Sequence, residues 1–158
     1  MHRYMRVGLV GVVLGVFGAC GTESNPNASN DTTTTEAATP TSAADGPVVK
    51  ATEKEFAIAL APPTAAAGEV HFTLHNEGKL DHEFVVFKSD LDPAQLPLNA
   101  EGNVDEEGAG VKHIGEQEAI KPGTAPDFAI SLDAGNYVVV CNLPGHYKAG
   151  MHTALKVT

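Results

Sequence analysis

The 158-residue chain has few basic residues, only two cysteines and no hydrophobic segment long enough to span a membrane as a helix. Its ten Lys and Arg are outnumbered by twenty Asp and Glu, and the formal net charge is −10. This negative charge argues against nucleic acid and against an anionic membrane surface as ligands, and it is compatible with a basic partner. The apolar run at residues 7–17 falls short of the roughly 20 residues that a transmembrane helix needs. No internal repeat is visible.

The N-terminus has the order of features found in an export signal. Arg3 and Arg6 precede the short apolar run, and Gly-Ala-Cys20 follows it. This order is typical of a secretory signal peptide. The segment Phe17-Gly-Ala-Cys20 also resembles the lipobox of bacterial lipoproteins. We therefore expect residues 1–19 to be removed, Cys20 to be lipidated, and the protein to be a cell-membrane lipoprotein facing the periplasm or the cell exterior. Ordinary cleavage near Cys20, which would release a soluble protein, is the alternative.

Two regions of different composition follow the signal. Residues 20–47 are rich in Thr, Ala, Ser, Asn and Pro and have no hydrophobic periodicity, so we predict a disordered tether. Residues 48–158 are enough for one compact domain with one core. Eight basic and sixteen acidic residues lie in this domain, which gives it a net charge of −8. We expect a monomer.

The domain has the alternation of strands. Residues 69–75 place Val70, Phe72 and Leu74 on one face, a period of two that indicates a half-buried strand. Further strands are expected at residues 48–51, 55–60, 82–88, 127–132, 136–141 and 152–157. Short strands separated by turn residues predict an all-β Greek-key sandwich of about seven to eight strands. For residues 89–115 we expect an irregular excursion with a helical turn near residues 93–96 and no core strand.

A group of side chains near the C-terminus indicates a metal site. Cys141, His146 and Met151 lie within eleven residues of one another. A thiolate with imidazole favours copper, and a weak axial thioether is typical of a one-electron copper centre. Such a site needs a second imidazole, which His82 offers at the start of another strand. Singly, each residue has an ordinary alternative: core packing for Cys and Met, and a surface position for His.

The joint occurrence of these residues is harder to explain by packing. Outside residues 1–20 the chain has one cysteine and one methionine, and both are in this segment. An unpaired cysteine in an exported protein is a liability unless something uses it, and ligating a metal is such a use. We expect one copper ion per chain.

The pattern N-x-G-x3-H-x-F from Asn76, followed by C-x4-H-x4-M from Cys141, is similar to that of the cupredoxins, the family of plastocyanins, azurins and rusticyanins. Its spacing resembles rusticyanin and sulfocyanin most, and C-x2-P-G-H also resembles azurin. The likeness covers most of residues 48–158. It implies His82, Cys141 and His146 as equatorial copper ligands and Met151 as the weak axial ligand.

The resemblance also points to residues around the ligands. Asn76 belongs to the shared pattern. Glu83 stands where plastocyanin and azurin carry an asparagine that braces the ligand loops. In relatives with this loop, the backbone N–H two residues after the cysteine donates to the sulfur, and Leu143 keeps that donor because it is not proline. Hydrogen bonds to the thiolate should raise the reduction potential.

The function that the resemblance implies is single-electron transfer between extracytoplasmic redox partners. Val140 and Asn142 flank the cysteine, so the histidines that connect type 1 copper to a catalytic copper in oxidases are missing, and we expect no enzymatic activity. Redox protein partners, basic ones among them, are expected to dock near His146. The alternatives are copper storage or delivery by an exported lipoprotein, and a metal-free adhesion module with the same architecture.

Overall fold

The computed structural model describes residues 46–158. The predicted signal peptide, the predicted lipidation of Cys20 and the predicted tether up to residue 45 lie outside the described residues. Within residues 46–158 the chain forms strands and one short 3-10 turn. The strands are β1 (Val48–Lys54), β2 (Ala57–Ala61), β3 (Thr64–Ala65), β4 (Gly68–Asn76), β5 (His82–Lys88), β6 (Lys112–Ile120), β7 (Asp127–Leu132), β8 (Gly135–Val140) and β9 (His152–Val157), and the turn is η1 (Pro93–Gln95). No helix among these residues has the length and apolar character to cross a membrane.

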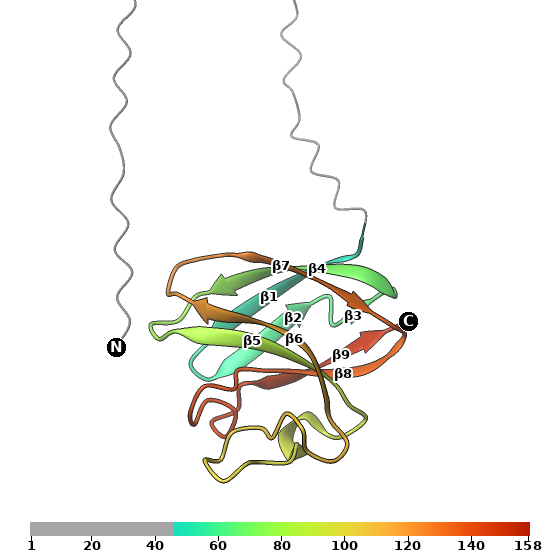
Figure 1. Ribbon diagram of the computed structural model, residues 1–158. Coiled ribbons are helices and arrows are strands. Elements are labelled where there is room, and N and C mark those ends of the chain that lie inside the picture. Colours follow the sequence, from blue (N-terminus) through green and yellow to red (C-terminus); the bar gives the residue numbers. More distant parts are fainter. Residues whose placement is uncertain (1–45) are drawn as a thin grey trace, which may run out of the picture. The chain divides into compact units, whose positions relative to one another are not determined.

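The strands form two packed sheets, which appear as upper and lower layers in Figure 1. One sheet has the order β2-β1-β4-β7 and the other the order β3-β9-β8-β5-β6. Strand β1 runs parallel to β4, and β3 runs parallel to β9, while the remaining pairs are antiparallel. The connections β2–β3, β3–β4, β4–β5, β6–β7 and β7–β8 cross from one sheet to the other. The predicted all-β Greek-key sandwich is confirmed.

The strand count corrects the prediction of seven to eight, because the described residues hold nine strands. The two-residue β3 was not expected, and β6 begins inside the excursion for which no strand was predicted. Strand β6 is an edge strand that pairs with β5 alone, and two irregularities interrupt the pairing. Edge strands carry polar side chains, and a bulge breaks the period of two, so the hydrophobic pattern that reveals a strand is absent here. The helical turn at residues 93–95 is present as η1.

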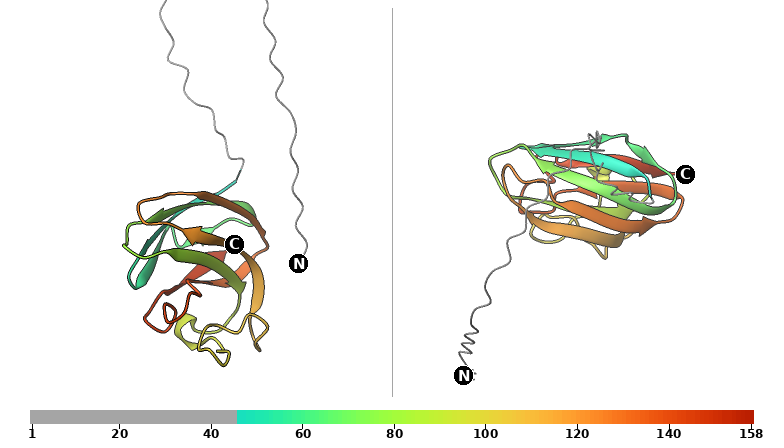
Figure 2. Two further views of the ribbon diagram at one scale, coloured as in Figure 1. Left: turned by 60° about the vertical axis from the view of Figure 1, so that its left-hand side comes forward. Right: turned by 90° about the horizontal axis from the view of Figure 1, so that it is seen from above.

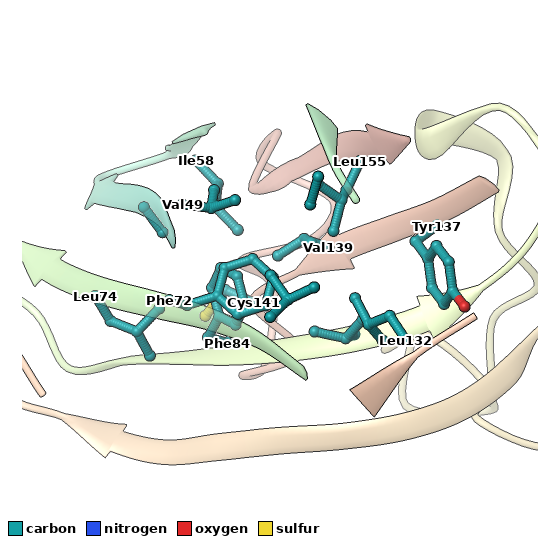
Figure 3. Close-up of a cluster of buried hydrophobic side chains, with 14 of the residues drawn as sticks. Val49, Ile58, Phe72, Leu74, Phe84, Leu132, Tyr137, Val139, Cys141 and Leu155 are labelled. Atoms are coloured by element: carbon teal, nitrogen blue, oxygen red, sulfur yellow. The ribbon is translucent and has the colours of Figure 1, made fainter. Parts of the chain in front are cut away.

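Apolar side chains from both sheets fill the space between them. Phe72 of β4 and Phe84 of β5 have no exposed surface, and their ring centroids are 5.0 Å apart. Figure 3 shows Cys141 beside these two rings, with Val139 and Leu155 farther along the same core. A second apolar cluster lies on the outer face of the five-stranded sheet. There the excursion contributes Leu96 and Val104, which pack over Val85 and Phe87 of β5.

Candidate metal centre

Three potential ligand atoms converge at one end of the sandwich. The Sγ atom of Cys141 lies 3.3 Å from Nδ1 of His146 and 3.9 Å from Nδ1 of His82. The two Nδ1 atoms are 3.3 Å apart. Cys141 and His82 have no exposed surface, and His146 is half-buried. The structure thus groups three of the four predicted ligands as a set that can hold one metal ion.

Met151, the fourth predicted ligand, is tied to the other residues through its backbone. Its N–H donates to the carbonyl of His146, and its carbonyl accepts from the N–H of Cys141, each at 3.1 Å. The side chain has no exposed surface and belongs to the same core cluster as Cys141. The sequence-predicted set therefore lies in one place, at the ends of strands β5, β8 and β9.

The loop between Cys141 and Met151 is held by its own backbone hydrogen bonds. The N–H of His146 donates to the carbonyl of Leu143 at 3.0 Å, which closes a turn before the imidazole. Gly145, at the last position of that turn before His146, has a φ of 83°, a conformation that residues with a Cβ rarely adopt. The fixed turn gives the imidazole of His146 a defined direction toward the thiol.

His82 is placed by the turn that Asn76 organises. The side-chain amide of Asn76 donates to the carbonyls of Leu80 and Ile120, both at 2.8 Å, and its oxygen accepts from the N–H of Gly78 at 2.9 Å. Both donors and the oxygen of a buried amide thus have partners, and they join the end of β4 to the turn before β5 and to the end of β6. Asn76, predicted as a neighbour of the ligands, shapes the segment from which His82 enters the site.

The protein environment disfavours charge on the side chains of Cys141 and His82. Burial raises the pKa of the Cys141 thiol to about 11, while backbone N–H groups of Glu83 and Leu143 oppose part of that rise. Burial also lowers the pKa of His82, and the nearby His146 lowers it further. The imidazole of His82 is therefore available as a neutral ligand, whereas the thiol must lose its proton when it binds a metal ion.

A backbone donor of Glu83 reaches the sulfur: its N–H donates to Sγ of Cys141 at 3.4 Å. The backbone of Leu143, where the sequence analysis expects a second donor, also acts to lower the pKa of the thiol. Burial raises the pKa of the Glu83 carboxyl, and the backbone of Asn142 opposes part of that rise. Through its own N–H, Glu83 connects the segment that carries His82 to Cys141.

Glu55 is a functional residue that the sequence analysis missed. Its Oε1 accepts from the backbone N–H groups of Lys79 and Leu80, both at 2.7 Å, and lies 3.5 Å from Nε2 of His82. These backbone donors lower the pKa of Glu55, so the carboxylate is ionised at neutral pH. Nε2 of His82 is buried and forms no hydrogen bond, so this carboxylate acts on the ring through its charge, which strengthens a ligating imidazole. The sequence expectation of a strand over residues 55–60 hid this role, because Glu55 lies in the turn between β1 and β2.

Glu53, on β1, was also missed. Its side chain has no exposed surface, and neither carboxylate oxygen has a hydrogen-bond partner. Burial raises its pKa to about 8, and the charge of Glu83 adds to this rise. The group is therefore uncharged at neutral pH. The alternation Val49, Ala51, Glu53 gave the only available signal, because it places a carboxyl on the inward face of a strand.

His146 is the ligand that reaches the surface. Pro144 and Ala149 beside it are exposed, and Leu143 is half-buried. Phe56, from the β1–β2 turn, is 42% exposed and meets the His146 ring edge-on, with the centroids 5.2 Å apart. The imidazole edge thus lies in an apolar surface contributed by two separate loops.

The donor set and its dimensions fit copper. Imidazole and thiolate ligands lie roughly 2.0 to 2.3 Å from a bound ion, so three of them in one plane are about 3.5 to 3.8 Å apart. The observed separations of 3.3, 3.3 and 3.9 Å bracket these values. One thiolate and two imidazoles, with a buried thioether beside them, form the set that copper electron-transfer sites use. This two-sheet fold and this ligand set define a cupredoxin.

Comparisons with known proteins agree with that class. A family model described as the sulfocyanin (SoxE) domain matches residues 26–158. The chain belongs to the sulfocyanin (SoxE) domain family. No curated protein matches the sequence. Cupredoxins bind copper, and most of them are electron carriers.

Solved structures share the fold. Reduced auracyanin from the photosynthetic bacterium Roseiflexus castenholzii is 21% identical, with a TM-score of 0.51, and the match covers 70% of this chain and 96% of auracyanin. Auracyanin A, a "blue" copper protein from Chloroflexus aurantiacus, is 20% identical, with a TM-score of 0.50, and the match covers 70% of this chain and 98% of auracyanin A. At these identities the similarity establishes the fold alone.

Proposed function

We propose that this protein carries single electrons between redox partners outside the cytoplasm, through one copper ion held by His82, Cys141, His146 and Met151. The observation that carries the proposal is the convergence of Cys141 Sγ and the two Nδ1 atoms within 3.3 to 3.9 Å in a buried, hydrogen-bonded setting. A scaffold that fixes its ligands limits the rearrangement between the two oxidation states of copper. Bound copper supplies the one-electron chemistry.

The half-buried His146 is the proposed route for electrons. Its ring edge is surrounded by Phe56, Leu143, Pro144 and Ala149, which offer an apolar contact with little to desolvate. Redox encounters use small interfaces that form and separate quickly. The negative charge of the domain supports a basic partner that is attracted over a longer range.

A matched pair of alanines tests this route. Ala149 lies in the ligand loop beside His146, while Ala134 is exposed in the β7–β8 turn, at the other end of β8 from Cys141. Two molecules exchanging electrons through the same surface bring two copies of any added charge together. Ala149→Glu should slow self-exchange, measured by NMR line broadening of mixed oxidised and reduced protein, by roughly tenfold at low salt. Ala134→Glu should leave the rate unchanged. Equal rates in both variants would place the route elsewhere.

Copper delivery is the competing function, and it makes a different prediction. A delivery protein must release its ion, whereas a fixed and buried ligand set holds it. We expect the copper-loaded chain to retain its blue colour in the presence of a weak chelator. Rapid bleaching by such a chelator would favour delivery.

The proposed location rests on the N-terminal sequence. Arg3, Arg6, the apolar run and Cys20 support export followed by lipid anchoring, and residues 20–47 would then connect the copper domain to the membrane. Replacing Cys20 by Ser should move the protein from the membrane fraction to the soluble fraction. A Cys20→Ser protein that stays in the membrane fraction would contradict the anchor.

A further inference from the structure

A second group of ligand-type side chains lies outside the copper site, where the excursion meets β6. Donor atoms of Glu106, His113 and Glu116 all lie within 4.8 Å of one another. Nε2 of His113 is 3.7 Å from Oε2 of Glu116. This nitrogen is shielded from solvent and has no hydrogen-bond partner. A shielded imidazole nitrogen between two carboxylates is a suitable ligand for a cation.

A bulge in β6 creates this arrangement. In a regular strand, residues 113 and 116 would point to opposite faces of the sheet. Here Phe87 pairs with His113, Val86 with Gly115 and Val85 with Glu116, so β6 contains one extra residue opposite β5. Bulges of this kind re-aim side chains and occur next to functional sites.

The residues within the bulge show which way each side chain turns. Ile114 packs against the core, and a Cβ on Gly115 would lie 2.6 Å from the Ile130 side chain of the other sheet. Both bulge residues therefore face inward. His113 and Glu116 accordingly point to the outer face, where Glu106 of the excursion reaches them.

The negative charge at this place has no basic partner. Among residues 46–158, neither Glu106 nor Glu116 forms an ion pair with a lysine or arginine. A divalent cation would neutralise this concentration of carboxylates.

The cluster is also in contact with the copper loop. Oε1 of Glu106 accepts a hydrogen bond from the side-chain amide of Asn142 at 3.2 Å, and Oδ1 of Asn142 accepts from the N–H of Val104 at 2.7 Å. Asn142 directly follows Cys141. A cation bound here would therefore hold the excursion against β6, next to the residue that follows the proposed copper ligand Cys141.

We propose that Glu106, His113 and Glu116 form a second, separate metal site that binds one divalent cation of the borderline class represented by Zn²⁺. One imidazole and two carboxylates are ligands that Zn²⁺ accepts, with water completing its coordination. Zinc ligands in a tetrahedron lie about 3.3 to 3.6 Å apart, so the 3.7 Å between His113 and Glu116 needs little closure.

Calorimetric titration of Zn²⁺ into the copper-loaded full chain tests the proposal, with the blue absorption followed in parallel. We expect one Zn²⁺ per chain and no change in colour. His113→Ala and Glu116→Gln should each weaken binding by at least about tenfold, since even the loss of an outer partner of a metal ligand costs about that much. His71→Ala is the matched control, because His71 also pairs with a carboxylate, that of Glu69 at 3.3 Å, but outside the cluster.

Three results would overturn the second site. They are the absence of Zn²⁺ uptake by the unaltered chain, uptake that both cluster variants leave unchanged, and uptake that bleaches the copper band because Zn²⁺ enters the copper site. A blue protein that fails to bind Zn²⁺ counts against this site alone and leaves the copper function intact.

Discussion

In the apolar core, Phe72 packs on Phe84 and Phe128 with ring centroids 5.0 and 6.2 Å apart, and Cys141 adjoins these rings, whereas the strand ends next to the ligands collect polar groups. Four polar or charged residues are buried within residues 46–158. Three of them, Glu53, Asn76 and His82, lie at or next to the adjoining ends of β1, β4 and β5. The side-chain amide of Asn76 makes three hydrogen bonds, but Glu53 has none on its carboxyl group. Burial of the apolar core stabilises the fold, whereas the buried polar groups at the ligand end lower the stability while they position the proposed metal ligands.

Removing a core ring should separate these two regions most clearly. Phe72→Ala should lower the free energy of unfolding by about 3 to 5 kcal/mol, because it leaves a large cavity in a close-packed interior. The copper colour of the folded variant should persist, since Phe72 is not a proposed ligand. Urea unfolding followed by circular dichroism measures the change. A decrease in the free energy of unfolding below about 1 kcal/mol would mean that the apolar core around Phe72 is not the main source of stability.

Glu53→Gln tests how the buried carboxyl at the ligand end affects stability, through the pH dependence of the unfolding free energy. The pKa of Glu53 is about 8 in the folded chain, against an ordinary value of 4.5 for a glutamate, so between these values the folded state holds a proton that the unfolded state has lost. Stability is therefore greatest below the lower value and falls as pH rises through the upper one. The variant should remove a slope of up to about 1.4 kcal/mol per pH unit from the unfolding free energy measured between pH 5 and 8.

The matched measurement uses urea unfolding of both proteins at several pH values in that range. Parallel curves for the two proteins would show that Glu53 ionises in the folded state as it does in the unfolded chain.

Glu55→Gln should shift the reduction potential without disturbing the turn, because the amide oxygen can still accept from Lys79 and Leu80. The carboxylate beside His82 stabilises the more positive oxidation state of copper. A tenfold loss of copper(II) affinity, at the lower end for such outer partners, corresponds to an increase of about 60 mV in a one-electron couple. Voltammetry measures it. Glu77→Gln, which removes an exposed carboxylate paired with Lys54, is the control and should not change the potential.

Leu143→Pro should have the smallest effect and the opposite sign. It deletes the backbone N–H that the sequence analysis expects to donate to Cys141 Sγ and that lowers the pKa of this thiol. The loss should return electron density to the sulfur and lower the potential. One hydrogen bond is worth on the order of 1 kcal/mol net, or about 40 mV. An unchanged potential in the copper-loaded variant would show that this donor does not tune the thiolate.

Sequence reasoning reached the parts of the molecule that have a periodic or chemical signature. Strand β4 was predicted because Val70, Phe72 and Leu74 alternate, and the ligand group was predicted because rare residue types share one spacing. Strand β6 was missed because its bulge and its edge position erase the alternation. Glu53 and Glu55 were missed because their roles depend on long-range pairing, which places β1 and its turn against Asn76 and His82.

The most direct test of the account is spectroscopy of the copper-loaded chain, compared with Cys141→Ser. The account predicts an intense blue absorption band from the thiolate and the paramagnetic resonance of a single cupric ion, with the band lost when the sulfur is replaced by oxygen. A chain that stays colourless with copper, or a Cys141→Ser variant as blue as the original, would contradict the proposal that Cys141 holds copper together with His82 and His146.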